Sequence, residues 1–209
     1  MYKVFIDNNS IQFKKRVKRS SNIPPQFMPK LNLDRLVDFQ HHLNSIEDDA
    51  SFIADNIDPE QLIQEYFCEF NYIEAAGGLI YNPLLQKHLF IKRWGRWDIP
   101  KGKIEQNESP KDAAIREIQE ECALDQVFIL DDLINTYHVY NAYGEYWLKK
   151  THWFIGITQE QNVAPQLDED IQSAEWLLDN DIPKVVESTY RSNREVIEEY
   201  MFKLQNIKT

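Results

Sequence analysis

The sequence predicts an α/β protein in two parts, a small N-terminal α+β region followed by a larger α/β region. Two observations support this fold class. Short segments with strand-like apolar patterns alternate with helix-like segments along the chain. The pattern also changes near residue 70, where longer apolar strands begin. We therefore predict domains at residues 1–69 and 70–209. A chain of 209 residues is long enough for one sizeable core and a small addition.

The N-terminal region shows turn and cap signals between short apolar segments. The tetrapeptide DNNS at 7–10 predicts a β-hairpin, and Asp58 followed by Pro59 predicts the start of a helix. A basic run at 14–19 is typical of a solvated loop, although it also fits polyphosphate or nucleic-acid binding. The predicted strands are Tyr2–Ile6, Ile11–Phe13 and Ser51–Ala54, and the predicted helices are Leu33–Leu43 and Pro59–Phe67.

The larger region alternates strands with three helices. The pair Gly77-Gly78 lies inside the first strand, which predicts close approach of another backbone or a ligand. Residues 93–106 are rich in Trp, Gly and Lys and predict a loop. The predicted strands are Tyr72–Tyr81, Leu89–Lys92, Val127–Leu130, Leu133–Tyr140, Trp147–Thr158 and Gln172–Trp176, and the predicted helices are Ser109–Glu121, Ile182–Val186 and Tyr190–Lys203.

The composition limits the class of protein. Hydrophobic residues make up 43% of the chain and charged residues 27%, which is typical of globular proteins. The sequence has no apolar run near the roughly 20 residues that span a bilayer, no signal-peptide pattern, and two cysteines, too few for a disulfide framework. We expect a cytoplasmic protein without a membrane partner. The net charge of −11 disfavours nucleic acid as a partner unless metal ions lie between carboxylates and phosphates.

One predicted helix carries a cluster of acidic residues. Ser109-Pro110 combines a good N-cap with proline at the first helical position. Glu117, Glu120 and Glu121 are three and four residues apart, so they converge on one face and repel each other. Arg116 or a bound Mg²⁺ or Mn²⁺ ion would offset this repulsion, because such ions prefer oxygen ligands. On the carboxylates alone, a solvated acidic face is the commoner interpretation.

The flanking residues favour the metal site. From Gly102 to Leu124 the sequence is GKIEQNESPKDAAIREIQEECAL. It resembles the Nudix box, G-x5-E-x7-R-E-U-x-E-E-x-G-U, where U is aliphatic. One fixed position departs, because Ala123 stands in place of the second glycine. The segments EAAGGLIY, LFIKRWGRWDIPKGKIE and THWFIGI resemble the family's surrounding strands, so the resemblance covers roughly residues 70–205.

The resemblance implies the family's fold and chemistry. The fold would be an α/β/α sandwich on a mixed sheet, with the box as a loop–helix–loop. The activity would be that of a pyrophosphohydrolase, in which Mg²⁺ or Mn²⁺ neutralises a diphosphate and lowers the pKa of a bound water. The implied metal ligands are Glu117, Glu121 and the Gly102 carbonyl. Glu120 would be a ligand or the general base, Glu108 would be an outer ligand or a brace, and Arg116 would orient the glutamates.

Three further features bear on the substrate. The run WDIPKGK from Trp97 resembles dinucleoside polyphosphate, diphosphoinositol polyphosphate and mRNA-decapping hydrolases, and the strand LKKTHWF from Leu148 resembles the first two. The late turn DED at 168–170 falls where some members place a further carboxylate. A solvated loop, strand packing and a polar turn are the plain alternatives. The candidate substrate-binding residues are Lys101, Lys103, Lys149, Lys150 and His152, and the candidate catalytic carboxylate of the late turn is Glu169.

Three functions follow from these features. A hydrolase of nucleoside-diphosphate-linked substrates comes first, with dinucleoside polyphosphates or diphosphoinositol polyphosphates favoured. An mRNA-decapping-like hydrolase is the alternative, supported by the N-terminal extension and disfavoured by the charge of −11. A non-catalytic Nudix-fold sensor or scaffold is the third, disfavoured because all the box glutamates are present. The sequence leaves a homodimer and the role of the N-terminal region open.

Overall fold

A computed structural model of the chain describes residues 2–6, 9–15, 50–54 and 58–207. The expected helix at 33–43 and residues 16–19 of the basic run lie outside them. The chain divides into two compact units, Met1–Ile73 with Thr136–Lys149, and Glu74–Asn135 with Lys150–Thr209. The first unit also contains residues 136–149, so it does not correspond to residues 1–69 alone. The predicted domain boundary between residues 69 and 70 stays a prediction.

The first unit is built on a hairpin and a short helix. Strand β1 (Tyr2–Ile6) pairs antiparallel with β2 (Asn9–Lys15), which confirms the predicted hairpin and extends it into the first two lysines of the basic run. Strand β1 also pairs in parallel with β9 (Thr136–Ala142), and β2 with β3 (Ala50–Ala54). Buried side chains of β1 and β2 pack with α2 (Pro59–Tyr66), whose N-cap is Asp58 as predicted.

The second unit is a sheet in the order β11-β5-β4-β10, with three short strands added to it. Two of these additions, β6 and β7, lie in the segment predicted as a loop. Each has only three residues, too few for an alternating pattern to be visible in the sequence. The strands are β4 (Asn71–Asn82), β5 (Lys87–Arg93), β6 (Arg96–Asp98), β7 (Lys101–Lys103), β8 (Phe128–Asp132), β10 (Glu145–Ile157) and β11 (Ile171–Leu177).

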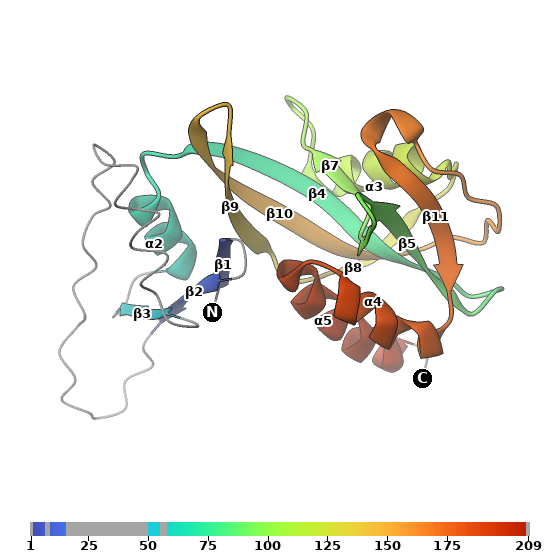
Figure 1. The fold of residues 1–209 in the computed structure, drawn as a ribbon. Coiled ribbons are helices and arrows are strands. Elements are labelled where there is room, and N and C mark those ends of the chain that lie inside the picture. Colours follow the sequence, from blue (N-terminus) through green and yellow to red (C-terminus); the bar gives the residue numbers. More distant parts are fainter. Residues whose placement is uncertain (1, 7–8, 16–49, 55–57, 208–209) are drawn as a thin grey trace. The chain divides into compact units, whose positions relative to one another are not determined.

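Helices cover both faces of this sheet (Figure 1). On β4, Leu79 packs in the cluster with α4 (Ile182–Ser188) and α5 (Arg191–Ile207), whereas the next residue, Ile80, packs in the cluster with α3 (Pro110–Cys122). Successive strand residues point to opposite faces, so α3 lies on one face and α4 and α5 on the other. The α/β/α fold with a mixed sheet is confirmed. Short 3-10 turns, Leu167–Glu169 and Asp179–Asp181, flank β11.

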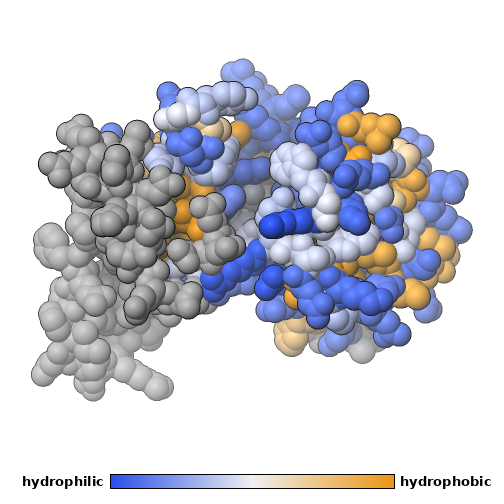
Figure 2. Space-filling model, in the orientation of Figure 1, coloured by the Kyte–Doolittle hydropathy of each residue, from blue (hydrophilic) through white to orange (hydrophobic). Residues whose placement is uncertain are grey.

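The surface agrees with the composition. Figure 2 shows that hydrophilic residues cover most of the described surface on the face in view, as expected for a chain with a net charge of −11. Within the described ranges, no helix is both long enough and apolar enough to cross a membrane.

Candidate active site

Helix α3 is fixed at both ends. Ser109 Oγ accepts a hydrogen bond from the Asp112 N–H at 3.2 Å, with proline in the first turn. At the C-terminal end, Ala123 adopts the left-handed conformation with φ 53°, and its N–H donates to the Gln119 carbonyl. Alanine therefore takes the conformation that glycine adopts without strain, at a cost of about 1–2 kcal/mol. Ala123 therefore preserves the end of helix α3 but lowers the stability of the fold.

Arg116 is the centre of the polar face of α3. Its guanidinium forms a bidentate pair with Glu108, both contacts being 2.9 Å. It also donates to Glu117 at 2.7 Å and to Glu120 at 3.1 Å. A further bond of 3.0 Å reaches the Lys103 carbonyl. The hydrogen bonds lower the pKa of Glu108 and raise that of Arg116. Arg116 thus offsets the repulsion among the glutamates and ties the preceding loop to the helix.

Gly102 lies against the Glu117 carboxylate. A Cβ at Gly102 would lie 1.9 Å from Glu117 Oε2 and 2.3 Å from Oε1, far inside van der Waals contact. The φ of Gly102 is not in the left-handed region, so space rather than backbone conformation requires glycine here. Burial raises the pKa of Glu117, and the bond from Arg116 opposes this rise. The glycine therefore makes room for a largely buried carboxylate.

Glu121 is the most deeply buried carboxylate of the helix, with 2% of its side chain exposed. The Lys101 backbone N–H donates to its Oε2 at 2.9 Å, and Arg93 Nη2 lies 3.8 Å from its Oε1. Burial raises the pKa of Glu121 to about 7, even though Lys101 and Arg93 act in the opposite direction. The neighbouring positive charges therefore do not fully offset the cost of burying the ionised Glu121 carboxylate.

Arg93 connects this helix to Glu169, in the turn before β11. Its Nη2 donates to Glu169 Oε2 at 2.9 Å, and its Nε donates to the Glu169 carbonyl at 2.8 Å. The same guanidinium faces Glu121, so both acidic groups share one cation. Sequence reasoning did not select Arg93. The contact joins residues 76 positions apart and depends on the pairing of β5 with β11, which gives no local signal.

The two lysines of β7, Lys101 and Lys103, lie in different environments. Lys101 Nζ donates to Asp98 Oδ2 at 2.5 Å and to the Ile99 carbonyl at 3.2 Å. Asp98 is 3% exposed and also accepts from Asn193 of α5 at 2.7 Å. The Lys101 ammonium is thus held within the loop, whereas Lys103 is exposed. Of the two, Lys103 is open to an approaching phosphate in this conformation.

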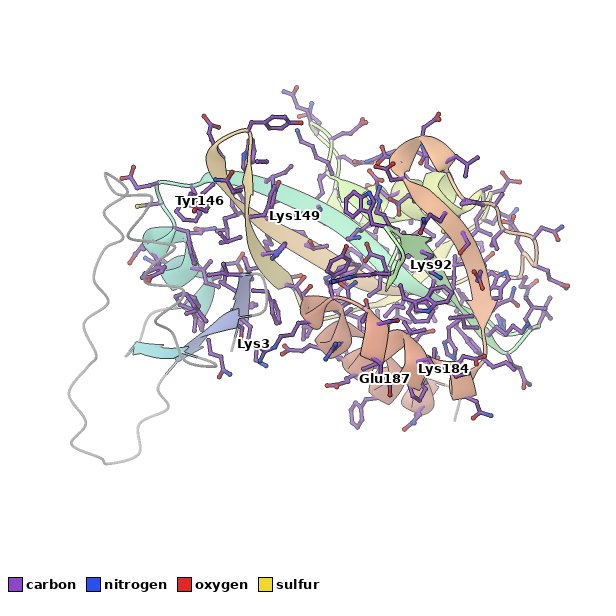
Figure 3. All side chains as sticks on the ribbon, viewed as in Figure 1. Lys3, Lys92, Tyr146, Lys149, Lys184 and Glu187 are labelled. Atoms are coloured by element: carbon purple, nitrogen blue, oxygen red, sulfur yellow. The ribbon has the colours of Figure 1, made fainter. Side chains whose placement is uncertain are left out.

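The candidates on β10 divide between the two sides of the strand. His152 Nε2 lies 3.0 Å from Glu74 Oε1, and Lys150 Nζ lies 3.9 Å from the same oxygen. Lys149 is the neighbouring residue and, by strand alternation, points to the other side; Figure 3 shows it projecting from β10. The structure therefore brings Lys150 and His152 together around Glu74 and separates Lys149 from them.

Comparison with known proteins gives the family. A family model described as the NUDIX domain matches residues 71–200. The chain belongs to the Nudix family. The solved MutT protein of Methanosarcina mazei Go1 has 20% sequence identity and a TM-score of 0.50, covering 65% of this chain and 96% of that one, and it shows the same fold.

Curated relatives match part of this chain. The mRNA-decapping enzyme subunit 2 of Saccharomyces cerevisiae is 29% identical over 136 residues, which cover 64% of this chain and 13% of the yeast protein. The 8-oxo-dGTP diphosphatase of Proteus vulgaris is 38% identical over 72 residues, covering 31% of this chain and 64% of that protein. The chain therefore spans only a small part of the length of the decapping relative.

The Nudix box supplies donors that fit a divalent metal, on which Nudix hydrolases generally depend. Glu117, Glu120 and Glu121 present carboxylate oxygens, the ligands that hard divalent cations prefer, and Gly102 leaves space beside them. Among the described residues, no three His, Cys, Asp or Glu side chains are already grouped as a metal site. Arg116 and the Lys101 N–H engage the carboxylate oxygens instead. An ionised carboxylate has about four lone-pair sites, so these hydrogen bonds leave acceptor sites for an ion.

Proposed function

We propose that this chain is a divalent-metal-dependent pyrophosphohydrolase that cleaves a phosphoanhydride bond, with Mg²⁺ or Mn²⁺ as the ion. One observation carries the proposal. Arg116 bonds to Glu108, Glu117 and Glu120 of the box. The Glu117 carboxylate, which lies against Gly102, and the Glu121 carboxylate are both largely buried. Buried carboxylates are costly without enough positive charge nearby, and the raised pKa of both groups reflects that cost. A divalent cation would offset it.

Each box residue has a distinct part in this proposal. Half of the Glu120 side chain, 51%, is exposed, so it can reach a water molecule and accept its proton. Arg116 keeps that carboxylate oriented through a bond of 3.1 Å. The proposed metal ligands are Glu117, Glu121, Glu120, the Gly102 carbonyl and, in an outer position, Glu108.

The reaction is hydrolysis at phosphorus. The bound ion would neutralise the diphosphate and lower the pKa of a coordinated water. Glu120 accepts the proton of the attacking water, whose oxygen forms a new bond to phosphorus. The bridging P–O bond breaks, and the departing phosphate keeps its electron pair. Lys103, exposed on β7, is the candidate to bind phosphate oxygens.

Other candidates must change partner to take part. Glu169 is the second candidate proton acceptor; its side chain is 56% exposed, and release from Arg93 would free it. Lys101 would have to leave Asp98, and Lys150 and His152 would have to leave Glu74, to contact a phosphate chain. Lys149 needs a substrate on the other side of β10. We therefore rank Lys103 and Glu120 first.

For the substrate we favour a nucleoside-diphosphate-linked anhydride, such as a dinucleoside polyphosphate or a diphosphoinositol polyphosphate. Hydrolysis of capped mRNA is the second candidate, and the similarity to decapping enzymes over 136 residues favours it. Another yeast relative, 29% identical over 136 residues, is named m7GpppN-mRNA hydrolase, and m7GpppN contains two nucleosides joined through phosphates, as a dinucleoside polyphosphate does. The net charge of −11 works against a long RNA path. The intact set of box glutamates works against a sensor without activity.

A substrate panel tests this proposal. The panel contains diadenosine polyphosphates, nucleoside-diphosphate sugars, ADP-ribose, diphosphoinositol phosphates and capped RNA, each assayed with Mg²⁺ and with Mn²⁺. We expect metal-dependent turnover of at least one nucleotide anhydride, and a loss of at least about 100-fold in Glu120→Gln, as expected when a general base is removed. Glu198→Gln, on the exposed side of α5, is the matched control.

Two results would count against the proposal. An unchanged rate in folded Glu120→Gln would refute the assigned base. No turnover of any panel member would favour the non-catalytic alternative. Decapping is separated by salt, because a long RNA path makes binding fall steeply as salt rises.

A further inference from the structure

An unusual turn stands next to the candidate active site. Strands β5 and β6 are joined by the two residues Trp94 and Gly95, and Arg93 pairs with Arg96 across the turn. Both connecting residues have positive φ, 49° for Trp94 and 75° for Gly95. Two positive φ values in a two-residue hairpin loop define a type I′ turn.

Tryptophan is a poor residue for this turn. Type I′ turns strongly favour Asn-Gly, because asparagine tolerates positive φ and bulky side chains do not. Trp94 also leaves 67% of its surface exposed, which gains little from hydrophobic burial. Trp94 therefore costs backbone strain and gains little from burial, so neither turn preference nor hydrophobic packing explains it. Such outliers occur at ligand-binding and active sites.

Arg93 links the Trp94 ring to two acidic residues of the candidate active site. The Arg93 guanidinium lies 5.6 Å from the centre of the Trp94 ring, within cation–π range. The same guanidinium is 2.9 Å from Glu169 and 3.8 Å from Glu121. Gly95 N–H donates to Gln172 Oε1 at 2.8 Å, which ties the turn to β11. The Trp94 ring therefore lies on a turn that is hydrogen-bonded to β11, next to acidic residues of the candidate active site.

We propose that Trp94 is the stacking platform for the base of a nucleotide substrate whose phosphoanhydride lies at the Nudix box. This inference rests on the proposed function and narrows it to nucleotides. An aromatic side chain can stack on any nucleobase, because every base has a π-face and no hydrogen-bond pattern has to match. A diphosphoinositol polyphosphate offers no planar ring, and its many phosphates face a chain of net charge −11.

Binding of two non-hydrolysable ligands tests the platform separately from catalysis. The probes are α,β-methylene-ADP, which has a base, and methylenebisphosphonate, which lacks one. Each probe is titrated into the full chain in the presence of Mg²⁺, and its affinity is measured by calorimetry. In Trp94→Asn we expect nucleotide affinity to fall at least about fivefold, the lower end of the loss for removal of a stacking aromatic. Bisphosphonate affinity should not change, and Trp94→Phe should keep most of the nucleotide affinity.

Stability separates stacking from a structural role. Asn-Gly suits the turn better than Trp-Gly, so Trp94→Asn should melt no lower than the wild type. Tyr143→Asn is the matched control, because Tyr143 is an exposed aromatic with φ 57° before Gly144 in the β9–β10 hairpin. It should leave nucleotide affinity unchanged.

Several results would overturn the platform. These are unchanged nucleotide affinity in Trp94→Asn, equal loss for both ligands, an equal loss in Tyr143→Asn, a lower melting temperature, or no binding of either probe to the wild type. A base-dependent loss in a chain that hydrolyses no panel substrate would support the platform and refute the proposed function.

Discussion

Replacing Gly102 with alanine tests how the structure builds the metal site. The new Cβ would lie 1.9 Å from Glu117 Oε2, and a Cβ contact closer than 3.0 Å is essentially never found. The carboxylate must therefore move by at least about 1.1 Å, or the loop must shift. A misplacement of about 1 Å can lower catalysis about 100-fold. The clashing atoms are the end of a flexible side chain, so we expect the loss of stability at the lower end of the range for overpacking, about 1 kcal/mol.

The assay is Mg²⁺-dependent turnover of the best panel substrate, together with urea unfolding. We expect kcat to fall about 100-fold in Gly102→Ala. The stability loss should be much smaller in a Glu117→Ala background, because the clashing carboxylate is then absent. A Gly102→Ala enzyme with wild-type kcat, or an equal stability loss in both backgrounds, would refute this explanation of the glycine.

Three further predictions concern stability. Ala123→Gly should stabilise the chain by about 0.5–1 kcal/mol in urea unfolding, because glycine relieves the left-handed strain at some cost in chain entropy; a lower stability would contradict this. Burial raises the pKa of Glu121 to about 7 from 4.5, so the metal-free fold holds a proton that the unfolded chain has released. Glu121 should therefore contribute a fall of about 3 kcal/mol in stability in EDTA as pH rises from about 4.5 to about 7, and this contribution should be absent in Glu121→Gln. Asp98→Ala should cost about 3 kcal/mol or more, because it leaves Lys101 and Asn193 without their shared acceptor; a melting temperature within 2 °C of the wild type would contradict that.

Local sequence signals sufficed where the interaction is local. The start of α3 follows from Ser109 and Pro110, and the shared helix face of Glu117 and Glu121 follows from their spacing. The resemblance to the Nudix box supplied the register of Gly102 with that helix. Its physical reason, the space needed by the Glu117 carboxylate, became visible only in three dimensions.

Contacts between distant segments could not be predicted from one sequence. The Arg93–Glu169 pair depends on how β5 pairs with β11, and the Asp98–Asn193 bond depends on how α5 packs on the sheet. Lys101, expected to bind phosphate, has its ammonium held by Asp98 three residues earlier, and Asn193 of α5 bonds to that same carboxylate. Helix and strand propensities and hydrophobic periodicity describe local structure, and they do not tell which distant residues pair with one another.

Hydrolysis in ¹⁸O-labelled water tests the central claim most directly. The wild-type chain is incubated with Mg²⁺ and a dinucleoside polyphosphate, and the products are weighed by mass spectrometry. We expect one ¹⁸O atom in a phosphate product, with no reaction in EDTA and at least about a 100-fold loss in Glu121→Gln. Label-incorporating hydrolysis that persists in EDTA or in folded Glu121→Gln would contradict a metal-dependent site on helix α3.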